Sequence, residues 1–377
     1  MRLVIDYTPA VRQSAGIGRH TRELVAALAP LLGEVSTTLL VYGRADAPLP
    51  RPPAGMTLRV VPIPNRWLTI GWHRLGAPLP VELLAAAHDL YHASDFVLPP
   101  VRKARTLLTV HDLSFLTTPE CADASLRAYL SKVVPPSVIR ADHILADSQA
   151  TKDDLIDLLH TSPGKVTVVY PGVDGRFQPV ADTDELRRVR TQYNIGDGPF
   201  VLGVGTLEPR KNWPLLIRAW TILRRTTSLP HRLVIAGGKG WLTHEIFAAV
   251  EASSFKEDIV LTGFVADADL PALYTSADVF AFPSLYEGFG IPVLEALACS
   301  TPVVCADNSS LPEAAGDAAL LADATDPQAF AAALQRLIED EMLRTELRQR
   351  GLRHAARFTW RRSAETLWQT YQQVLHG

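Results

Sequence analysis

The sequence predicts an α/β protein built from two doubly wound domains with parallel sheets. Its 377 residues are too many for one ordinary hydrophobic core, so two domains are expected. Short apolar runs alternate with longer helical stretches, which is typical of βα units. This alternation breaks in a polar stretch around Gln178–Asp184 and then restarts. We therefore expect a first domain over residues 1–178 and a second over 179–358, followed by a terminal helix over 359–377.

The first half begins with the apolar run Arg2–Asp6, which predicts a strand. A loop with two glycines and a helix through residues 23–28 should follow. Asp147 and Ser148 are expected to cap another helix that runs to Leu159. The other strands expected in this half are Thr38–Tyr42, Leu58–Pro62, Leu90–His92, Thr106–Val110, His143–Ala146 and Val166–Tyr170.

The second half repeats the same pattern of apolar runs and helical stretches. Strands are expected at Phe200–Val204, Arg232–Ala236, Ile259–Leu261, Val279–Phe282, Pro302–Cys305 and Ala319–Leu321. Helices should cover residues 327–338 and 339–357, and Thr359 should cap the terminal helix. One side of that helix is apolar at helical spacing, which predicts packing. Its members are Trp360, Leu367, Trp368, Tyr371 and Leu375.

Composition excludes several classes of protein. The net charge of −3 gives no general electrostatic reason for binding nucleic acid. The chain has three cysteines without metal-ligand spacing, which fits a reducing cytoplasm. Its start lacks a secretory pattern, and no apolar run approaches the roughly 18 residues of a membrane span. We expect a soluble cytoplasmic protein, at most peripheral at the inner face of a membrane.

The segment 286–295 is the most informative stretch of the chain. It follows a buried strand, contains two glycines, and places Pro292 where a helix should start. The first turn of such a helix favours an anion. Glu287 precedes the helix and Glu295 lies inside it. This order suits a sugar joined to a nucleoside by a diphosphate, although the glycines alone would also fit an ordinary strand–helix turn.

Other candidate residues also follow strands. Arg210 and Lys211 come after the first strand of the second domain, where two cations at a helix start suit phosphate oxygens. His111 follows the strand 106–110, where it could bind a sugar hydroxyl or be satisfied by loop backbone. Asp267 and Asp269 match an acid-x-acid metal motif. We interpret Asp267 as a helix N-cap and expect no catalytic metal.

The run Tyr-Glu-Gly-Phe-Gly-Ile-Pro-Val-Leu-Glu-Ala at 286–296 resembles the retaining glycosyltransferases of family 4 (group 1). The run Thr-Val-His-Asp-Leu-Ser-Phe-Leu at 109–116 is similar to mannosyltransferase-like members. Weaker matches extend from residue 16 to about 326. The resemblance implies the GT-B fold: two Rossmann-like domains facing each other across a cleft, with the last helix crossing back to the first domain. It also implies that the first domain binds the acceptor and the second binds the nucleotide sugar.

The resemblance also implies roles for particular residues. Catalytic roles fall to Glu287, His111, Lys211 and Arg210. Substrate-binding roles fall to Gly16, Gly18, Glu295, Phe289, Gly290, Ile291, Phe264 and Val265. Many relatives have an arginine where this chain has Thr206, so Arg210 is the candidate to replace it.

The function implied is retaining, metal-independent transfer of a hexose from a nucleotide-diphosphate sugar to a hydroxyl of a glycan or lipid-linked acceptor. No cofactor is expected, because the nucleotide sugar is a co-substrate. GDP-mannose is the first expectation and UDP-glucose the second. The alternatives are a nucleotide-sugar epimerase and a non-catalytic nucleotide-sugar-binding module. Arg66–Arg74 mixes aromatic and basic residues and could contact a lipid-linked acceptor or membrane, but packing is the preferred interpretation.

Overall fold

The computed structural model describes residues 1–13, 16–43, 49–74, 77, 79–85 and 87–376. These residues form two compact units. Unit 1 comprises Met1–Leu116, Ala124–Gly172 and Thr359–Gly377, and unit 2 comprises Thr117–Asp123 and Val173–Phe358. The main segment of unit 2 therefore begins at Val173, ahead of the expected boundary. The polar stretch Gln178–Asp184 is not the linker, because Asp182 caps a helix of unit 2.

Unit 1 contains a seven-stranded parallel sheet in the order β3-β2-β1-β4-β5-β6-β7. The order changes direction between β1 and β4, so the carboxyl ends of these two strands mark the place where doubly wound sheets bind ligands. The strands are β1 (Arg2–Asp6), β2 (Ser36–Tyr42), β3 (Met56–Val61), β4 (Leu90–Ala93), β5 (Arg105–Val110), β6 (His143–Ala146) and β7 (Val166–Val168).

Helices cover both faces of this sheet, and each face has its own apolar core. Helix α5 continues through Pro135 and Pro136, which the sequence pattern did not predict as helical. The helices and shorter turns are α1 (Thr8–Arg12), α2 (Ile17–Leu32), α3 (Asn65–Thr69), η1 (Ile70–Arg74), η2 (Val81–Leu83), α4 (Ser114–Thr117), η3 (Pro119–Cys121), α5 (Ala124–Arg140), α6 (Gln149–Leu159) and η4 (Pro163–Lys165).

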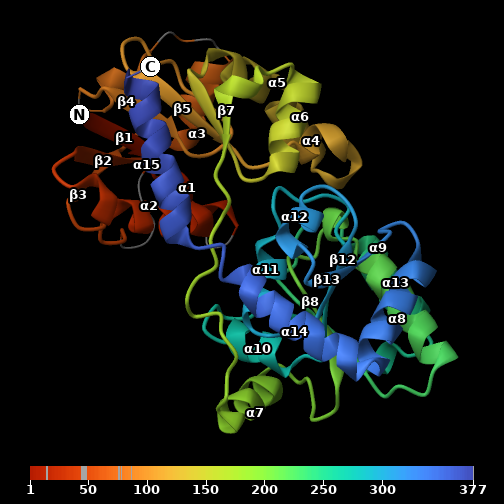
Figure 1. Ribbon diagram of the computed structural model, residues 1–377. Helices are drawn as coiled ribbons and strands as arrows, with labels where there is room; N and C mark the ends of the chain where they lie inside the picture. The colour runs from red at the N-terminus through yellow and green to blue at the C-terminus, as the bar shows by residue number, and fades with distance from the viewer. Residues whose placement is uncertain (14–15, 44–48, 75–76, 78, 86, 377) are drawn as a thin grey trace. The chain divides into compact units, whose positions relative to one another are not determined.

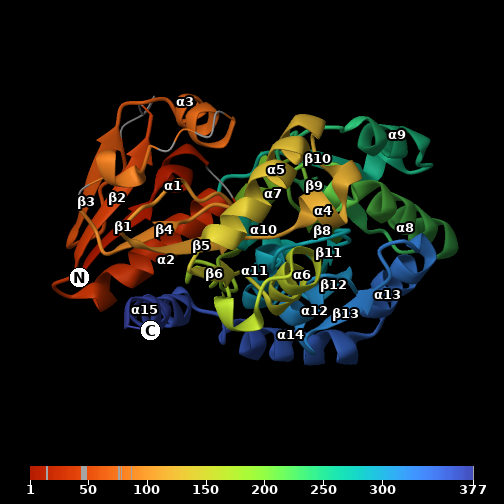
Figure 2. The same cartoon turned by 90° about the horizontal axis from the view of Figure 1, so that it is seen from above.

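The terminal helix α15 (Trp360–His376) belongs to unit 1, as expected. Thr359 precedes it, and its Oγ1 accepts a hydrogen bond from the N–H of Arg362 at 3.3 Å. Trp360, Leu367 and Tyr371 are buried in one apolar core with residues of α2 and of the sheet. Figures 1 and 2 both show α15 beside α2. The apolar stripe of this helix is therefore a packing face.

Unit 2 contains a six-stranded parallel sheet in the order β10-β9-β8-β11-β12-β13. Here the order changes direction between β8 and β11. The strands are β8 (Phe200–Val204), β9 (Arg232–Ala236), β10 (Ile259–Gly263), β11 (Val279–Phe282), β12 (Val303–Ala306) and β13 (Ala319–Ala322). These strands agree with the expected ones to within two residues at each end.

The helices of unit 2 again bury two apolar cores, one on each face of the sheet. They and the shorter turns are α7 (Thr183–Gln192), η5 (Pro209–Lys211), α8 (Trp213–Thr226), α9 (His244–Ala252), η6 (Lys256–Asp258), α10 (Leu270–Ser276), α11 (Ile291–Ala298), α12 (Leu311–Ala315), α13 (Pro327–Glu339) and α14 (Glu341–Ala355). Asp267 was expected to cap α10. That expectation is wrong, because the residue before the helix is Asp269 and its side chain does not cap it.

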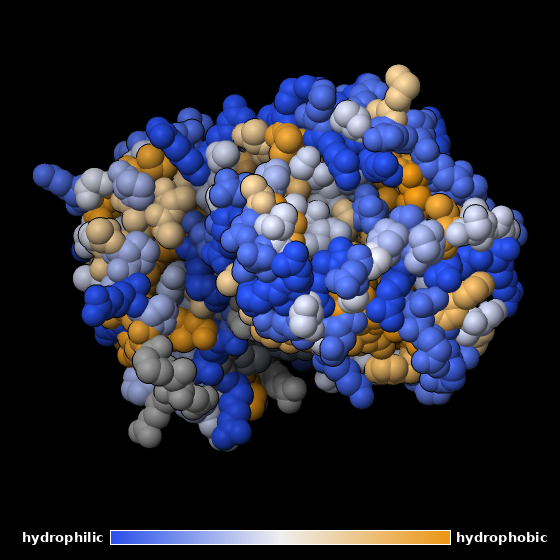
Figure 3. Space-filling view, turned by 90° about the horizontal axis from the view of Figure 1, so that it is seen from below, coloured by the Kyte–Doolittle hydropathy of each residue, from blue (hydrophilic) through white to orange (hydrophobic). Residues whose placement is uncertain are grey.

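Among the described residues, no helix has the length and apolar character needed to cross a bilayer. Figure 3 shows one face of the molecule, on which polar side chains predominate and apolar atoms occur in separate groups. Trp67, in α3, is 56% exposed. Trp72, in the following turn, is half-buried, and its ring packs edge-on against Tyr42 with centroids 5.6 Å apart. The aromatic segment thus contributes one residue to packing and leaves the other at the surface.

Candidate functional site

The carboxyl ends of β8 and β11 bring most of the expected donor-site residues of unit 2 together. Arg210 and Lys211 lie in the turn η5 after β8, and Glu287 lies in the loop after β11. β8 and β11 are hydrogen-bonded neighbours at the point where the sheet order changes direction. Sequence positions 76 residues apart therefore meet at one edge of the sheet.

Glu287 is held between the two cations. Its Oε1 accepts a hydrogen bond from Lys211 Nζ at 2.6 Å, and its Oε2 accepts one from Arg210 Nη1 at 2.8 Å. Arg210 Nη1 also donates to the carbonyl of Tyr286 at 2.9 Å, and its Nη2 donates to Glu208 Oε1 at 3.0 Å. Glu287, Lys211 and Glu208 are all buried. The carboxylate is thus fixed in position by charge-assisted bonds.

The electrostatics of this network keep Glu287 ionised. Burial by itself would raise the pKa of the Glu287 carboxyl, but the charges of Arg210 and Lys211 outweigh burial and lower it to about 2. The side chain is therefore a carboxylate at any physiological pH. Such a group accepts hydrogen bonds and donates none, which suits recognition of hydroxyl groups.

The loop between β11 and α11 is fixed by its neighbours. The N–H of Glu287 donates to Ser309 Oγ at 3.0 Å, and Ser310 Oγ donates to the carbonyl of Glu287 at 2.8 Å. Gly290 precedes α11 with φ at 103°, a conformation that favours glycine. A Cβ there would lie 2.7 Å from Leu311 Cδ2. The glycine thus lets the chain turn sharply into Ile291 and start the helix.

The remaining expected residues of unit 2 lie in different surroundings. Glu295 is buried within α11, and its Oε2 accepts a hydrogen bond from the Tyr274 hydroxyl at 3.0 Å. Phe289 is buried, and its ring packs on Phe358 with centroids 5.6 Å apart. Beyond β10, Phe264 is 69% exposed whereas Val265 is buried.

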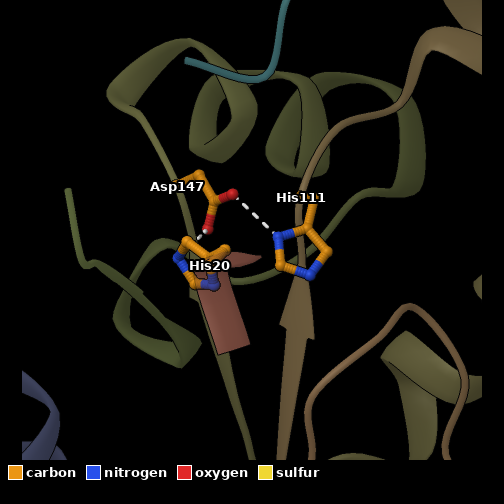
Figure 4. A group of neighbouring side chains, drawn as sticks. All are labelled: His20, His111 and Asp147. Atoms are coloured by element: carbon orange, nitrogen blue, oxygen red, sulfur yellow. Dashed lines mark hydrogen bonds and ion pairs between the residues drawn. The ribbon is translucent and has the colours of Figure 1, made fainter. Parts of the chain in front are cut away.

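In unit 1, His111 belongs to a buried cluster with His20 and Asp147 (Figure 4). His111 follows β5, Asp147 follows β6, and His20 lies in the first turns of α2. His111 Nδ1 lies 2.8 Å from Asp147 Oδ2, and His20 Nε2 lies 3.6 Å from Asp147 Oδ1. The side chain of Asp147 contacts both histidines of this cluster and so does not cap α6. The cap of α6 comes from Ser148, whose Oγ accepts from the N–H of Thr151, so of the expected capping pair only Ser148 caps.

Both ring nitrogens of His111 face oxygen acceptors, since Nε2 lies 3.0 Å from the carbonyl of Ser94. Only the imidazolium can donate to both. Burial alone would lower the pKa of His111, but the charge and hydrogen bond of Asp147 dominate and raise it to about 9. For His20, burial lowers the pKa to about 4. The cluster therefore holds one charged and one neutral imidazole. A sugar hydroxyl could bind His111 only by replacing one of these two contacts.

The same cluster is also the candidate for a metal among the described residues, because its three ligand atoms lie within 4.8 Å of one another. A metal there would have to replace the hydrogen bond between His111 and Asp147. The other candidate pair, Asp267 and Asp269, is less suitable. Asp269 accepts hydrogen bonds from Tyr193 at 2.7 Å and Gln192 at 3.1 Å, and it pairs with Arg188.

The glycine loop of unit 1 shows two different requirements. Gly16 has φ at 57° and open space where a Cβ would stand. Gly18, inside α2, has ordinary backbone angles, but a Cβ there would lie 2.0 Å from the carbonyl oxygen of Gln13. The first glycine therefore allows the turn, and the second allows α2 to approach the preceding chain closely.

Four members of these clusters were missed by sequence reasoning. Glu208 lies two residues before Arg210 and could have been found from the alternation of charges there. Tyr274 and His20 carried no signal, because their partners are 21 and 127 residues away along the chain. Asp147 was noticed only as a cap.

Comparison with known proteins points to one family. The model described as "Glycosyltransferase Family 4" matches residues 14–176, and the model described as "Glycosyl transferases group 1" matches residues 187–354. O-antigen chain mannosyltransferase B of Escherichia coli is 31% identical over 373 residues, which cover 96% of each chain.

Two further comparisons extend this result. A D-inositol 3-phosphate glycosyltransferase of Salinispora arenicola is 37% identical over 252 residues, which cover 63% of this chain and 56% of that protein. Sucrose-phosphate synthase of Thermosynechococcus elongatus superposes with a TM-score of 0.79 at 21% identity, over 99% of this chain and 98% of the synthase. At that identity the likeness shows the two-domain fold and nothing about the substrate.

Proposed function

We propose a specific reaction for this chain, which belongs to the group 1 glycosyltransferases of family 4, has their GT-B fold and is a hexosyltransferase that uses nucleotide sugars. It moves a hexose onto a glycan or lipid-linked hydroxyl, with retention of configuration and without a metal. Mannose from GDP-mannose is the first candidate, since a full-length relative is named as a mannosyltransferase. Glucose from UDP-glucose is the second. Family membership gives no support to the epimerase or binding-module alternatives.

The buried contact of Lys211, Glu287 and Arg210 carries this proposal. Glu287 is locked as a carboxylate and would accept hydrogen bonds from hydroxyls of the donor sugar. Lys211 Nζ has three donors and makes one hydrogen bond, to Glu287, within the described part of the chain. Its other N–H groups would donate hydrogen bonds to the diphosphate oxygens.

In the proposed reaction, the bond between the anomeric carbon and the diphosphate oxygen breaks, and a bond from the acceptor oxygen to that carbon forms. The acceptor proton leaves with the nucleotide diphosphate. Arg210, Lys211 and the first turn of α11 would stabilise the charge that grows on the leaving group. The amides of Phe289, Gly290 and Ile291 would add hydrogen bonds to it.

The other assignments follow the order of the donor along the site. Glu295 would hold the ribose hydroxyls, and the backbone of Phe264 and Val265 would contact the base. His111 would position the donor sugar, with a sugar hydroxyl replacing the carbonyl of Ser94 at Nε2. Gly16 and Gly18 would lie near the donor phosphates.

A panel of nucleotide sugars tests the proposal. We expect release of nucleotide diphosphate from one donor, faster with a hydroxyl acceptor than without, and a product whose anomeric configuration by NMR equals that of the donor. An inverted product would contradict retention. Epimerised donor without nucleotide release would indicate an epimerase, and binding without turnover would indicate a binding module.

A further inference from the structure

A cavity of about 430 Å³ opens at the carboxyl edge of the unit 1 sheet, lined by described residues of that unit alone. It lies where β1 and β4 mark the change of strand order, because Asp6 ends β1 and Asp95 follows β4. This volume falls within the range of about 300–1,000 Å³ usual for small-molecule sites. None of its residues has a role in the donor site proposed above. Gln13 and Ile17, which line the cavity, lie next to the glycine loop.

The cavity combines two carboxylates with aromatic rings. Asp6 and Asp95 line it together with Tyr42, Trp72 and Tyr129. Asp6 Oδ1 accepts a hydrogen bond from the N–H of Thr8 at 2.9 Å, and Asp95 Oδ2 accepts one from Gln13 Nε2 at 3.2 Å. A carboxylate can accept about four hydrogen bonds, so both have capacity for hydroxyl groups.

The charge of the cavity disfavours an anion. Its charged side chains are Asp6, Asp95 and Arg12. The Nε and Nη2 atoms of Arg12, which form one of the two edges by which a guanidinium can hold a phosphate in a bidentate manner, both donate to the carbonyl of Tyr42, at 3.1 and 2.9 Å. Burial raises the pKa of Asp6 to about 6 and raises that of Asp95 as well. Another negative charge among these groups would be repelled.

We propose that this cavity binds the acceptor as a neutral sugar unit, with Asp6 and Asp95 accepting hydrogen bonds from its hydroxyls and the aromatic rings contacting its C–H face, and that it excludes acceptors carrying a phosphate at that unit. This inference rests on the proposed transferase function and names its acceptor class. One relative is named D-inositol 3-phosphate glycosyltransferase; under this proposal, a phosphate-bearing compound of that kind would not bind in the cavity.

Direct binding to the full chain tests the inference without requiring turnover. The probes are methyl α-mannoside, α-glucoside and α-galactoside, each compared with its own 6-phosphate, by saturation-transfer NMR in the absence of donor. We expect at least one neutral glycoside to bind more tightly than its phosphate. Equal or tighter binding of the phosphates, or no binding of any neutral glycoside, would overturn the inference.

Isosteric variants test whether the neutral glycoside binds in this cavity. We expect Asp6→Asn and Asp95→Asn each to weaken binding of the neutral glycoside, and to raise its KM as acceptor, by about 10- to 100-fold, with the KM of the donor unchanged. Asp153→Asn, at an exposed aspartate of the same unit, is the matched control and should bind like the wild type. Wild-type binding by both cavity variants would overturn the inference.

These measurements separate two kinds of failure. If binding behaves as expected but no donor is turned over, the proposed transferase function fails and the sugar site stands. If transfer occurs and neither carboxylate variant alters acceptor binding or KM, the transferase stands and the acceptor assignment is wrong.

Discussion

At the scale of single residues, Lys211 is the most direct test of the donor site. Its Nζ contacts Glu287 at 2.6 Å, and Arg210 would still neutralise that carboxylate if the lysine were removed. Lys211→Ala should therefore fold and lose mainly the leaving-group charge. We expect turnover to fall by about 10²–10³-fold, measured as nucleotide diphosphate release.

The control is Lys256→Ala, because Lys256 is exposed in the same unit and pairs with Glu251 at 2.9 Å. It should retain wild-type turnover. Near-wild-type turnover of Lys211→Ala would show that this lysine does not stabilise the charge on the leaving group.

The His111–Asp147 pair predicts a residue-specific titration. The folded pKa of His111, about 9, lies above the ordinary value of 6.5. The stabilisation it provides is therefore complete below pH 6.5 and is lost as the pH rises toward 9. In Asp147→Asn we expect the His111 pKa to fall from about 9, measured by NMR on protein with ¹⁵N-labelled histidine. The stability loss between pH 6.5 and 9 should shrink in this variant.

Asp153→Asn again provides the control and should leave the titration of His111 unchanged. A neutral His111 at pH 7 in the wild-type protein would contradict the assignment. It would also restore the ring nitrogens as ordinary candidates for binding a sugar hydroxyl.

At the scale of elements, Gly290 determines how α11 begins. Its φ of 103° is unfavourable for other residues, and an added Cβ would also press on Leu311. We expect Gly290→Ala to destabilise the protein by about 1–3 kcal/mol and to raise the KM for the donor, because the first turn of α11 would shift. Urea unfolding and donor kinetics measure the two effects.

Gly198→Ala is the matched control, because Gly198 lies in unit 2 with ordinary φ and open space where a Cβ would stand. Its stability should remain close to that of the wild type. A Gly290→Ala protein with unchanged stability and donor KM would show that the loop tolerates another conformation.

Helix α15 provides a second test at this scale. Leu367 is 1% exposed in the core of unit 1, so Leu367→Ala should cost about 2–5 kcal/mol. Hydrogen exchange followed by mass spectrometry should show lost protection in unit 1 peptides, with unit 2 unaffected. The exposed Gln372 of the same helix supplies the control, Gln372→Ala. Equal loss of protection in both units would contradict the assignment of α15 to unit 1.

Elements were well predicted because their signals are local. Strands such as β8, β11 and β12 are continuous apolar runs, and a parallel sheet buried on both faces requires such runs. Contacts across the chain were not predictable in this way. Nothing near Glu295 in sequence indicates Tyr274, and the loop bonds of Ser309 and Ser310 to Glu287 depend on how β11 and β12 lie side by side.

Residue type alone also led to the wrong capping residue in two places. Aspartates are good caps and good ion-pair partners, so Asp267 and Asp147 could not be assigned from spacing. In the structure Ser148 caps α6, and the Asp147 carboxylate pairs with the buried imidazolium of His111. Only the neighbouring strand, which brings His111 beside β6, distinguishes the two possibilities.

At the scale of the whole molecule, the reaction should not depend on a metal. Arg210 and Lys211 already provide positive charge at the donor site, and the acid-x-acid pair is engaged through Asp269. We expect transfer to be unchanged in EDTA, measured as turnover before and after addition of the chelator. Activity lost in EDTA and restored by Mg²⁺ or Mn²⁺ would require a metal site.

The assignment of α15 to unit 1 has a consequence for protein synthesis. Unit 1 includes residues that precede the main segment of unit 2 and residues that follow it, and its core contains Trp360, Leu367 and Tyr371. While the ribosome is still translating unit 2, the nascent first half lacks these side chains and leaves apolar surface uncovered. Unit 2, which is contiguous apart from a short segment, can become compact first. The residues that follow unit 2 therefore complete a core whose other members precede it.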